Sequence, residues 1–256
     1  MTTSPFDLSG KAAVVTGGNG GIGLGMARGL AAAGAAVAIV GRNEAKSKQA
    51  ASELTAAGGR AIALTADVTS RDDATRMMEE TKRAFGGVDI LINNAGINIR
   101  KPAHVMAIDE WHKVIDTNLT SAVHAVQAAY PLMKAAGGGK IINIGSMLSI
   151  FGASFAPAYA ASKGGIVQFT KSLACAWAPD NIQANAVLPG WIDTELTEGA
   201  RQQVDGLHDR VLARTPAGRW GVPGDLAGIA VFLSSSASDF VTGTAIPVDG
   251  GYSTSG

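Results

Sequence analysis

Short runs of apolar residues alternate with longer, alanine-rich segments along the whole chain. The apolar runs predict seven strands, at Ala12–Val15, Ala36–Val40, Ala61–Ala66, Ile90–Asn93, Lys140–Gly145, Ile182–Val187 and Ala245–Val248. Runs such as Val-Ala-Ile-Val are apolar at every position, which is typical of strands buried on both faces of a sheet. The intervening segments predict helices that begin near Gly21, Glu44, Arg71, Ile108, Pro157 and Pro223.

This alternation predicts an α/β fold of the doubly wound Rossmann type. We expect a seven-stranded parallel sheet with helices on both faces and right-handed crossovers. The 256 residues contain no internal repeat and no linker, so a single domain over residues 1–256 is the economical prediction. The least regular stretch, Trp191 to Arg219, is polar and is expected to form a lid over a site.

Composition narrows the possible partners. The chain is 46% hydrophobic and its 21 basic residues balance 21 acidic ones, so neither nucleic acid nor an anionic membrane is an expected partner. The single cysteine, Cys175, rules out an internal disulfide and is expected to be a small buried hydrophobe. Without a signal-peptide pattern or a membrane-spanning stretch, a cytoplasmic protein is expected. The four histidines lack the spacing of metal ligands, so no metal site is expected.

Tyr159 and Lys163, four residues apart, are the first candidates for chemistry. Positions i and i+4 share one face of a helix, so the lysine ammonium is expected beside the phenol. A free tyrosine has a pKa of about 10, and a neighbouring cation favours the phenolate and lowers that pKa. Tyr159 is therefore predicted to be a general acid and base, with Ser146 holding a substrate oxygen in line with it.

A glycine-rich turn follows the first predicted strand, in the run Thr16-Gly17-Gly18-Asn19-Gly20-Gly21-Ile22-Gly23. Glycines let the backbone turn sharply and approach a pyrophosphate, and the next helix supplies amide donors and the positive end of its dipole. The spacing G-x-G-x-x-G is met by Gly18, Gly20 and Gly23. Its place between a strand and a helix indicates a dinucleotide cofactor.

In its other register, Thr-Gly-x-x-x-Gly-x-Gly, the turn resembles that of the short-chain dehydrogenase/reductase family. Other elements similar to family motifs follow in the expected order: Asp67-Val68, Asn93-Asn94-Ala95-Gly96, the tetrad Asn118, Ser146, Tyr159 and Lys163, Pro189-Gly190-Trp191-Ile192-Asp193-Thr194, and Asp249-Gly250-Gly251. The resemblance implies an NAD(P)-dependent oxidoreductase that interconverts a secondary alcohol and a ketone. It also implies that Lys163 binds the nicotinamide ribose, that Asn118 holds a water, and that the C-terminal element lies at a homotetramer interface.

The resemblance further implies which residues bind the cofactor. They are Thr16, Gly17, Asn19, Gly21, Ile22, Gly23, Arg42, Asp67, Val68, Asn94, Ala95, Gly96, Tyr159, Lys163, Pro189, Gly190, Ile192 and Thr194.

The end of the second predicted strand bears on the choice between NAD and NADP. Enzymes that use NAD usually carry an acidic residue there for the ribose hydroxyls, whereas this chain has Gly41 followed by Arg42. A guanidinium can pair with a 2′-phosphate through two hydrogen bonds, so NADP is the expected cofactor. The family also has a basic position within the glycine turn, which Gly20 occupies here, and a solvated Arg42 would leave NAD as the alternative.

Substrate contacts are expected from Arg100, Ser146, Met147, Tyr159 and Trp191. The segments 94–100, 146–149 and 216–221 look like those of the gluconate 5-dehydrogenase and 2-deoxygluconate 3-dehydrogenase branch, which acts on sugar acids. Those relatives often carry two adjacent arginines where this chain has Ile99 and Arg100. One arginine can still clamp a carboxylate, while a solvated Arg100 beside Ile99 would suit a neutral or more apolar ketone.

Two other functions remain as alternatives. A 3-oxoacyl-carrier-protein reductase would be expected to carry an arginine where this chain has Cys175, and zero net charge gives little attraction for an acidic carrier. A non-catalytic nucleotide-binding protein would be expected to have lost the tyrosine or lysine of the tetrad, and this chain keeps both.

Overall fold

Seven parallel strands form one sheet in the order β3-β2-β1-β4-β5-β6-β7, in a computed structural model that describes residues 4–255. The strands are β1 (Ala12–Thr16), β2 (Ala36–Gly41), β3 (Arg60–Thr65), β4 (Ile90–Asn93), β5 (Gly139–Ile144), β6 (Ile182–Pro189) and β7 (Ala245–Val248). The chain winds outward from β1 to β3 and then returns to add β4 on the other side of β1. This confirms the doubly wound prediction and puts the switch point, where such sheets bind ligands, between β1 and β4.

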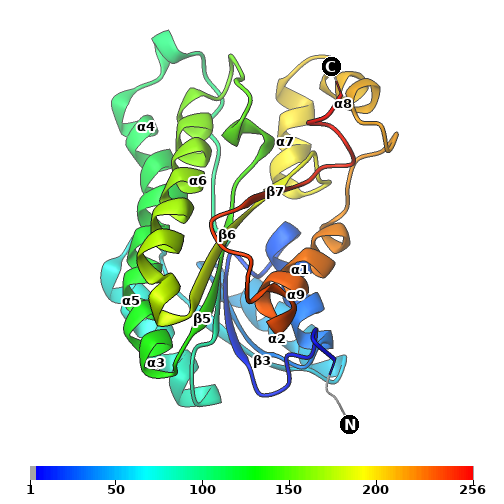
Figure 1. The fold of residues 1–256 in the computed structure, drawn as a ribbon. Helices are drawn as coiled ribbons and strands as arrows, with labels where there is room; N and C mark the ends of the chain where they lie inside the picture. The colour runs from blue at the N-terminus through cyan, green and yellow to red at the C-terminus, as the bar shows by residue number, and fades with distance from the viewer. Residues whose placement is uncertain (1–3, 256) are drawn as a thin grey trace.

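Helices cover both faces of the sheet (Figure 1). One face packs against α1 (Gly21–Ala32), α2 (Glu44–Ala56) and α9 (Ala227–Ser234). The other packs against α3 (Arg71–Phe85), α5 (Ser121–Ala135) and α6 (Pro157–Trp177). The helix α4 (Ile108–Ile115) leads into α5 through a π-helical turn, Asp116–Thr120.

Alternation of side chains along the central strands divides the core in two. In β1, Val15 packs with Met26 in the first core, while its neighbour Val14 packs with Met77 in the second. Every residue of β1 is buried, so neither face of the strand needs polar side chains. The two cores hold the carboxyl ends of the strands in a fixed frame.

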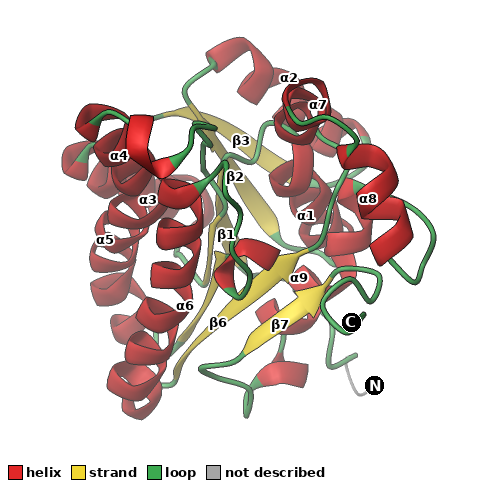
Figure 2. Cartoon of the chain, turned by 90° about the horizontal axis from the view of Figure 1, so that it is seen from above, coloured by secondary structure: helices red, strands yellow, loops and turns green. Residues whose placement is uncertain are grey.

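The segment 191–219 is more regular than its sequence suggests. It contains α7 (Glu195–Gln203) and α8 (Leu207–Arg214), which lie at the carboxyl end of the sheet (Figures 1 and 2). Both helices share a small apolar cluster of their own with Trp220. The helix expected at Pro223 begins as a 3₁₀ turn, Pro223–Leu226, before α9 continues it. Within residues 4–255, none of the helices has the length and apolar character needed to cross a membrane.

Candidate active site

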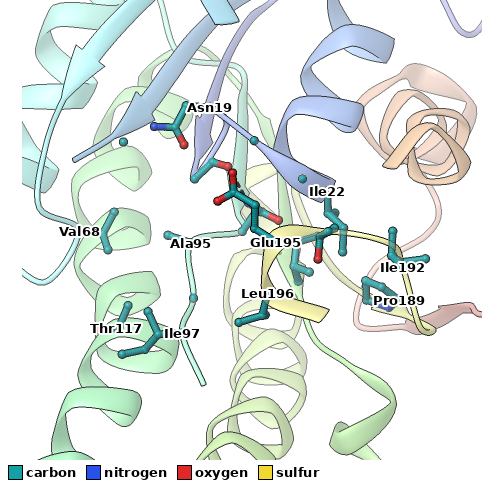
Figure 3. Close-up of a pocket in the computed structure, with 18 of the residues that line it drawn as sticks. Asn19, Ile22, Val68, Ala95, Ile97, Thr117, Pro189, Ile192, Glu195 and Leu196 are labelled. Atoms are coloured by element: carbon teal, nitrogen blue, oxygen red, sulfur yellow. Dashed lines mark hydrogen bonds between the residues drawn. The ribbon is translucent and has the colours of Figure 1, made fainter. Parts of the chain in front are cut away.

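A cavity of about 460 Å³ opens at the carboxyl ends of the strands, and we call it the strand-end cavity. Segments from all parts of the chain line it, from the turn before α1 to the first turn of α7. Of the predicted cofactor residues, all but Thr16 and Gly23 line its wall. Figure 3 shows how Asn19, Ala95 and Pro189 surround this space.

The glycine turn is shaped to bring backbone to the cavity. Gly17 and Gly21 have φ angles of +63° and +49°, a left-handed conformation that favours glycine. A Cβ at Gly17 would lie 2.9 Å from the Asn94 side-chain nitrogen, so no larger residue fits there. The turn therefore exposes amide groups and the N-terminus of α1 to the cavity, which suits a pyrophosphate.

Thr16 and Gly23 support this turn from behind. The Thr16 hydroxyl accepts hydrogen bonds from the backbone amides of Asn94 (3.0 Å) and Ala95 (3.2 Å). Asn94 in turn donates its side-chain amide to the carbonyls of Thr16 (3.0 Å) and Gly17 (3.1 Å). A Cβ at Gly23 would run into the Gly17 carbonyl. Both predicted residues thus hold the turn's shape and do not face the cavity.

Tyr159 and Lys163 lie together on α6 at the cavity wall, as their spacing predicted. The Lys163 nitrogen is 5.6 Å from the centre of the Tyr159 ring and donates a 2.6 Å hydrogen bond to the Ile144 carbonyl. Burial lowers the pKa of Lys163 to about 8. A lysine with that pKa is still largely protonated at pH 7.

The electrostatics of Tyr159 differ from the expectation. Burial raises the pKa of the phenol, while the nearby Ser146 hydroxyl and the positive charge of Arg100 act in the opposite direction. Lys163 is not among the groups that lower this pKa. The desolvation of the phenol outweighs the charges around it, because an anion in a site shielded from water is strongly disfavoured.

Ser146 and Asn118 are fixed by hydrogen bonds close to this pair. Ser146 caps a short turn, its hydroxyl accepting from the Leu148 amide at 3.1 Å. Asn118 is buried in the π-helical turn, where its amide group accepts from the Ile97 nitrogen (2.8 Å) and donates to the Ile97 carbonyl (2.9 Å). Neither residue lines the strand-end cavity itself, although Asn118 anchors a loop that does.

Of the five predicted substrate residues, only Tyr159 lines the strand-end cavity. Arg100 lines an adjacent cavity with Asn98 and Phe155. Its guanidinium donates to the Gln203 side chain (3.1 Å) and the Leu196 carbonyl (2.9 Å) on α7, while its Nε is buried without a partner in the described part of the chain. Arg100 is therefore tied to α7 and is not freely solvated.

The other two predicted substrate residues pack among other side chains and do not line the strand-end cavity. Met147 is buried in a small apolar cluster with Val167 and Leu188. Trp191 packs edge-on against Trp220, with ring centres 5.6 Å apart, and lines a third cavity beside Asp249.

Several lining residues are not among the predicted site residues. They are Gly20, Gly41, Lys46, Ala66, Ile97, Thr117, Ile144, Gly145, Glu195, Leu196 and Thr197. The ammonium of Lys46 is 2.8 and 3.1 Å from the two carboxylate oxygens of Glu195, a contact between residues 149 positions apart. Only the fold brings such residues together.

The residues present fit a dinucleotide. The glycine turn offers amide groups for a pyrophosphate, and Arg42 and Lys46 supply positive charge on the wall beside Asp67. Hydrogen bonds from Thr69 hold the pKa of Asp67 below its usual value, and the charge of Arg42 adds to the effect. The backbone of Thr69 is one of these donors, at 3.0 Å.

Two further sequence expectations concern metal and cysteine. Among residues 4–255, no group of three or more histidine, cysteine, aspartate or glutamate side chains is arranged to hold a metal ion. Cys175 is exposed, so the prediction of a buried small hydrophobe is wrong. Cys175 lies on the side of α6 that faces away from the sheet. The apolar residues next to it in the sequence do not show this.

A doubly wound sheet with a glycine-turn cavity at its switch point defines a dinucleotide-binding protein. Comparison with known proteins identifies the family. The family model described as Enoyl-(Acyl carrier protein) reductase matches residues 17–253. The 2-dehydro-3-deoxy-D-gluconate 5-dehydrogenase of Dickeya dadantii is 44% identical over 253 residues, which are 98% of this chain and 99% of that protein. The gluconate 5-dehydrogenase of Gluconobacter oxydans is 40% identical, with 98% of this chain and 97% of that protein covered.

A solved structure agrees with these relatives. A gluconate 5-dehydrogenase from Burkholderia cenocepacia, in complex with NADP and tartrate, is 41% identical, with a TM-score of 0.93 and 98% of each chain covered. The chain belongs to the short-chain dehydrogenase/reductase family. It is an NAD(P)-dependent oxidoreductase that acts on CH–OH groups.

Proposed function

We propose that this chain uses NADP to interconvert the secondary alcohol and the ketone of a sugar acid. The observation that carries the proposal is the position of Tyr159 and Lys163, on the wall of the same cavity as the glycine turn. A proton-transfer group and a cofactor site that share one cavity are what a carbonyl reduction needs. When bound, the nicotinamide group supplies or accepts the hydride.

Tyr159 transfers the proton in this scheme. In reduction its phenol gives a proton to the carbonyl oxygen, and in oxidation it takes the proton of the alcohol. Burial favours the protonated phenol, which is the form that reduction requires. Ser146 and Arg100 favour the phenolate that forms, and Ser146 also positions the substrate oxygen. Lys163 lies beside the ring, where it would hold the nicotinamide ribose. Asn118 organises the loop before α4 and the solvent near Lys163.

The preference for NADP rests on Arg42. Its guanidinium lies on the cavity wall at the end of β2, where an acidic residue would favour NAD. The complex of the Burkholderia cenocepacia relative with NADP supports the same cofactor. The remaining cofactor contacts are the predicted residues that line the cavity.

The sugar-acid substrate rests on Arg100 and on the relatives. Two relatives at 40% identity or more are named for gluconate or a deoxy-gluconate derivative. Arg100 is the positive charge that acts on Tyr159, so a carboxylate bound there would lie on the substrate side of the phenol. Met147 and Trp191 act through packing around this site.

We also propose the arrangement of the whole protein. Residues 1–256 form one Rossmann domain whose segment 191–219 is a lid, and four copies assemble into a homotetramer in the cytoplasm. The lid is supported by the contacts of α7 with Lys46, which lines the strand-end cavity, and with Arg100, which lines the adjacent cavity. The tetramer is supported by the family resemblance of Asp249-Gly250-Gly251.

The test is turnover of a keto-gluconate with NADPH by wild type and Tyr159→Phe. Losing the transferable proton is expected to lower turnover by at least about 10²-fold with cofactor binding kept. The control is Tyr130→Phe, which removes a hydroxyl on α5 that donates to the Asp180 carboxylate at 2.8 Å; neither residue lines the cavity. Near-normal turnover by Tyr159→Phe would reject the role of the tyrosine. A substrate panel with a neutral ketose and a 3-oxoacyl-carrier-protein thioester distinguishes the alternative substrates.

A further inference from the structure

One ion pair crosses the mouth of the strand-end cavity. Lys46 lies in the first turn of α2, where its backbone amide donates to the capping Asn43 side chain at 3.0 Å. Glu195 is the first residue of α7 and lies over the cavity in Figure 3. Their side chains meet at 2.8 and 3.1 Å, and both residues line the cavity. The pair therefore joins the cofactor side of the cavity to the proposed lid.

Lys46 is placed where a second phosphate contact is useful. It shares its part of the wall with Arg42 and Gly41, the end of β2 that the 2′-phosphate would approach. Arg42 makes no hydrogen bond within the described chain that would withdraw it from a ligand, whereas the Lys46 ammonium is held by a carboxylate.

A phosphate can replace the Glu195 carboxylate as the partner of the Lys46 ammonium. The side chains of Lys46 and Glu195 are 51% and 87% exposed, and ion pairs so open to water are weak and screened by salt. A phosphate group carries more charge and three acceptor oxygens, so it is the stronger partner for an ammonium. Glu195 loses little when its partner leaves, because an acidic residue in the first turn of a helix is stabilised by the helix dipole.

We propose that Lys46 is a second residue for the 2′-phosphate of NADP, and that Glu195 holds it until the phosphate takes its place. The proposal rests on the proposed use of NADP. It makes the choice of cofactor depend on α7 as well as on β2. NADH, which has no 2′-phosphate, leaves the Lys46–Glu195 pair intact.

The experiment is fluorescence titration of NADPH and NADH into the full chain without substrate. The variants are Lys46→Met, Glu195→Gln and the two together, with Lys48→Met as the matched control. Lys48 is also a lysine of α2, but it pairs with Glu44 and does not line the cavity. Losing a charge-assisted hydrogen bond to phosphate is expected to weaken NADPH binding by about tenfold in Lys46→Met. NADH binding should stay within about twofold of wild type.

Glu195→Gln is expected to tighten NADPH binding by about two- to fivefold, the equivalent of one exposed ion pair. In the combined variant this gain should vanish, because there is no ammonium left to release. Lys48→Met should change neither affinity.

Two results would overturn the proposal. One is a ratio of NADPH to NADH affinity that Lys46→Met leaves unchanged while wild type binds NADPH normally. The other is a gain from Glu195→Gln that persists in the combined variant. Absence of binding of either cofactor to wild type would instead reject the proposed function.

Discussion

Burial of Lys163 should leave a measurable mark on stability as the pH is changed. The residue is only 3% exposed, and burial lowers its pKa from 10.5 to about 8. Below pH 8 the lysine is protonated in both the folded and the unfolded chain, so it adds no pH dependence. Between pH 8 and 10.5 the unfolded chain binds this proton and the folded chain does not. Stability therefore rises with pH over this window, and above it the effect is complete.

The size follows from the pKa difference. A fall from 10.5 to about 8 corresponds to about 3 kcal/mol, at about 1.36 kcal/mol for each pKa unit. The same quantity is the amount by which the charged lysine destabilises the fold at neutral pH. The hydrogen bond from the ammonium to the Ile144 carbonyl offsets part of this cost.

The measurement is urea unfolding of wild type and Lys163→Met, followed by tryptophan fluorescence at fixed protein concentration from pH 7 to 10.5. Other groups titrate in both proteins, so the difference in unfolding free energy isolates Lys163. Across this window the unfolding free energy of wild type should rise relative to that of Lys163→Met by up to about 3 kcal/mol. Lys48→Met, at a largely exposed site on α2, controls for the loss of one positive charge. A difference that stays flat, or that falls with pH, would refute the reasoning.

Three further expectations concern cofactor, substrate and assembly. Arg42→Ala should reduce the affinity for NADPH by about tenfold and leave that for NADH nearly unchanged, measured by fluorescence titration; equal losses for both would argue against a phosphate contact. Arg100→Ala should abolish a preference for a keto-gluconate over its uncharged ketose, measured as the ratio of kcat/KM, and a preference that survives would exclude a carboxylate clamp. Light scattering at micromolar concentration should give the mass of four chains, and a monomer mass would exclude the tetramer.

The sheet could be predicted closely from the sequence, because burial on both faces leaves continuous apolar runs. β4 and β7 have the predicted bounds, and β6 continues two residues further, to Pro189. Helices α7 and α8 were harder to predict from the sequence, because the segment is polar and only a few apolar residues pack beneath the two helices. The position of Cys175 shows the same limit, because a helix rich in small residues does not reveal which side faces the sheet.

The candidate site divides in a similar way. Tyr159 and Lys163 were predictable because their contact is local, four residues apart on one helix. The contact between Lys46 and Glu195 was not, because nothing in either segment indicates a partner 149 residues away. The direction in which the pKa of Tyr159 shifts could not be predicted from the sequence. It is set by desolvation, which depends on all the groups packed around the phenol and which outweighs the neighbouring charges.

The π-helical turn Asp116–Thr120 makes the chain sensitive to length at this point. It carries Asn118 between α4 and α5, and its wider turn accommodates a residue that a regular α-helix would not. Deleting one residue here would let the helix run on regularly, because the π turn holds one residue more than an α-helical turn. The wider turn that places Asn118 would then be lost, and with it the two hydrogen bonds between the Asn118 side chain and the Ile97 backbone. Loop shortening or helix grafting in this protein should therefore keep the five residues 116–120 together as a unit.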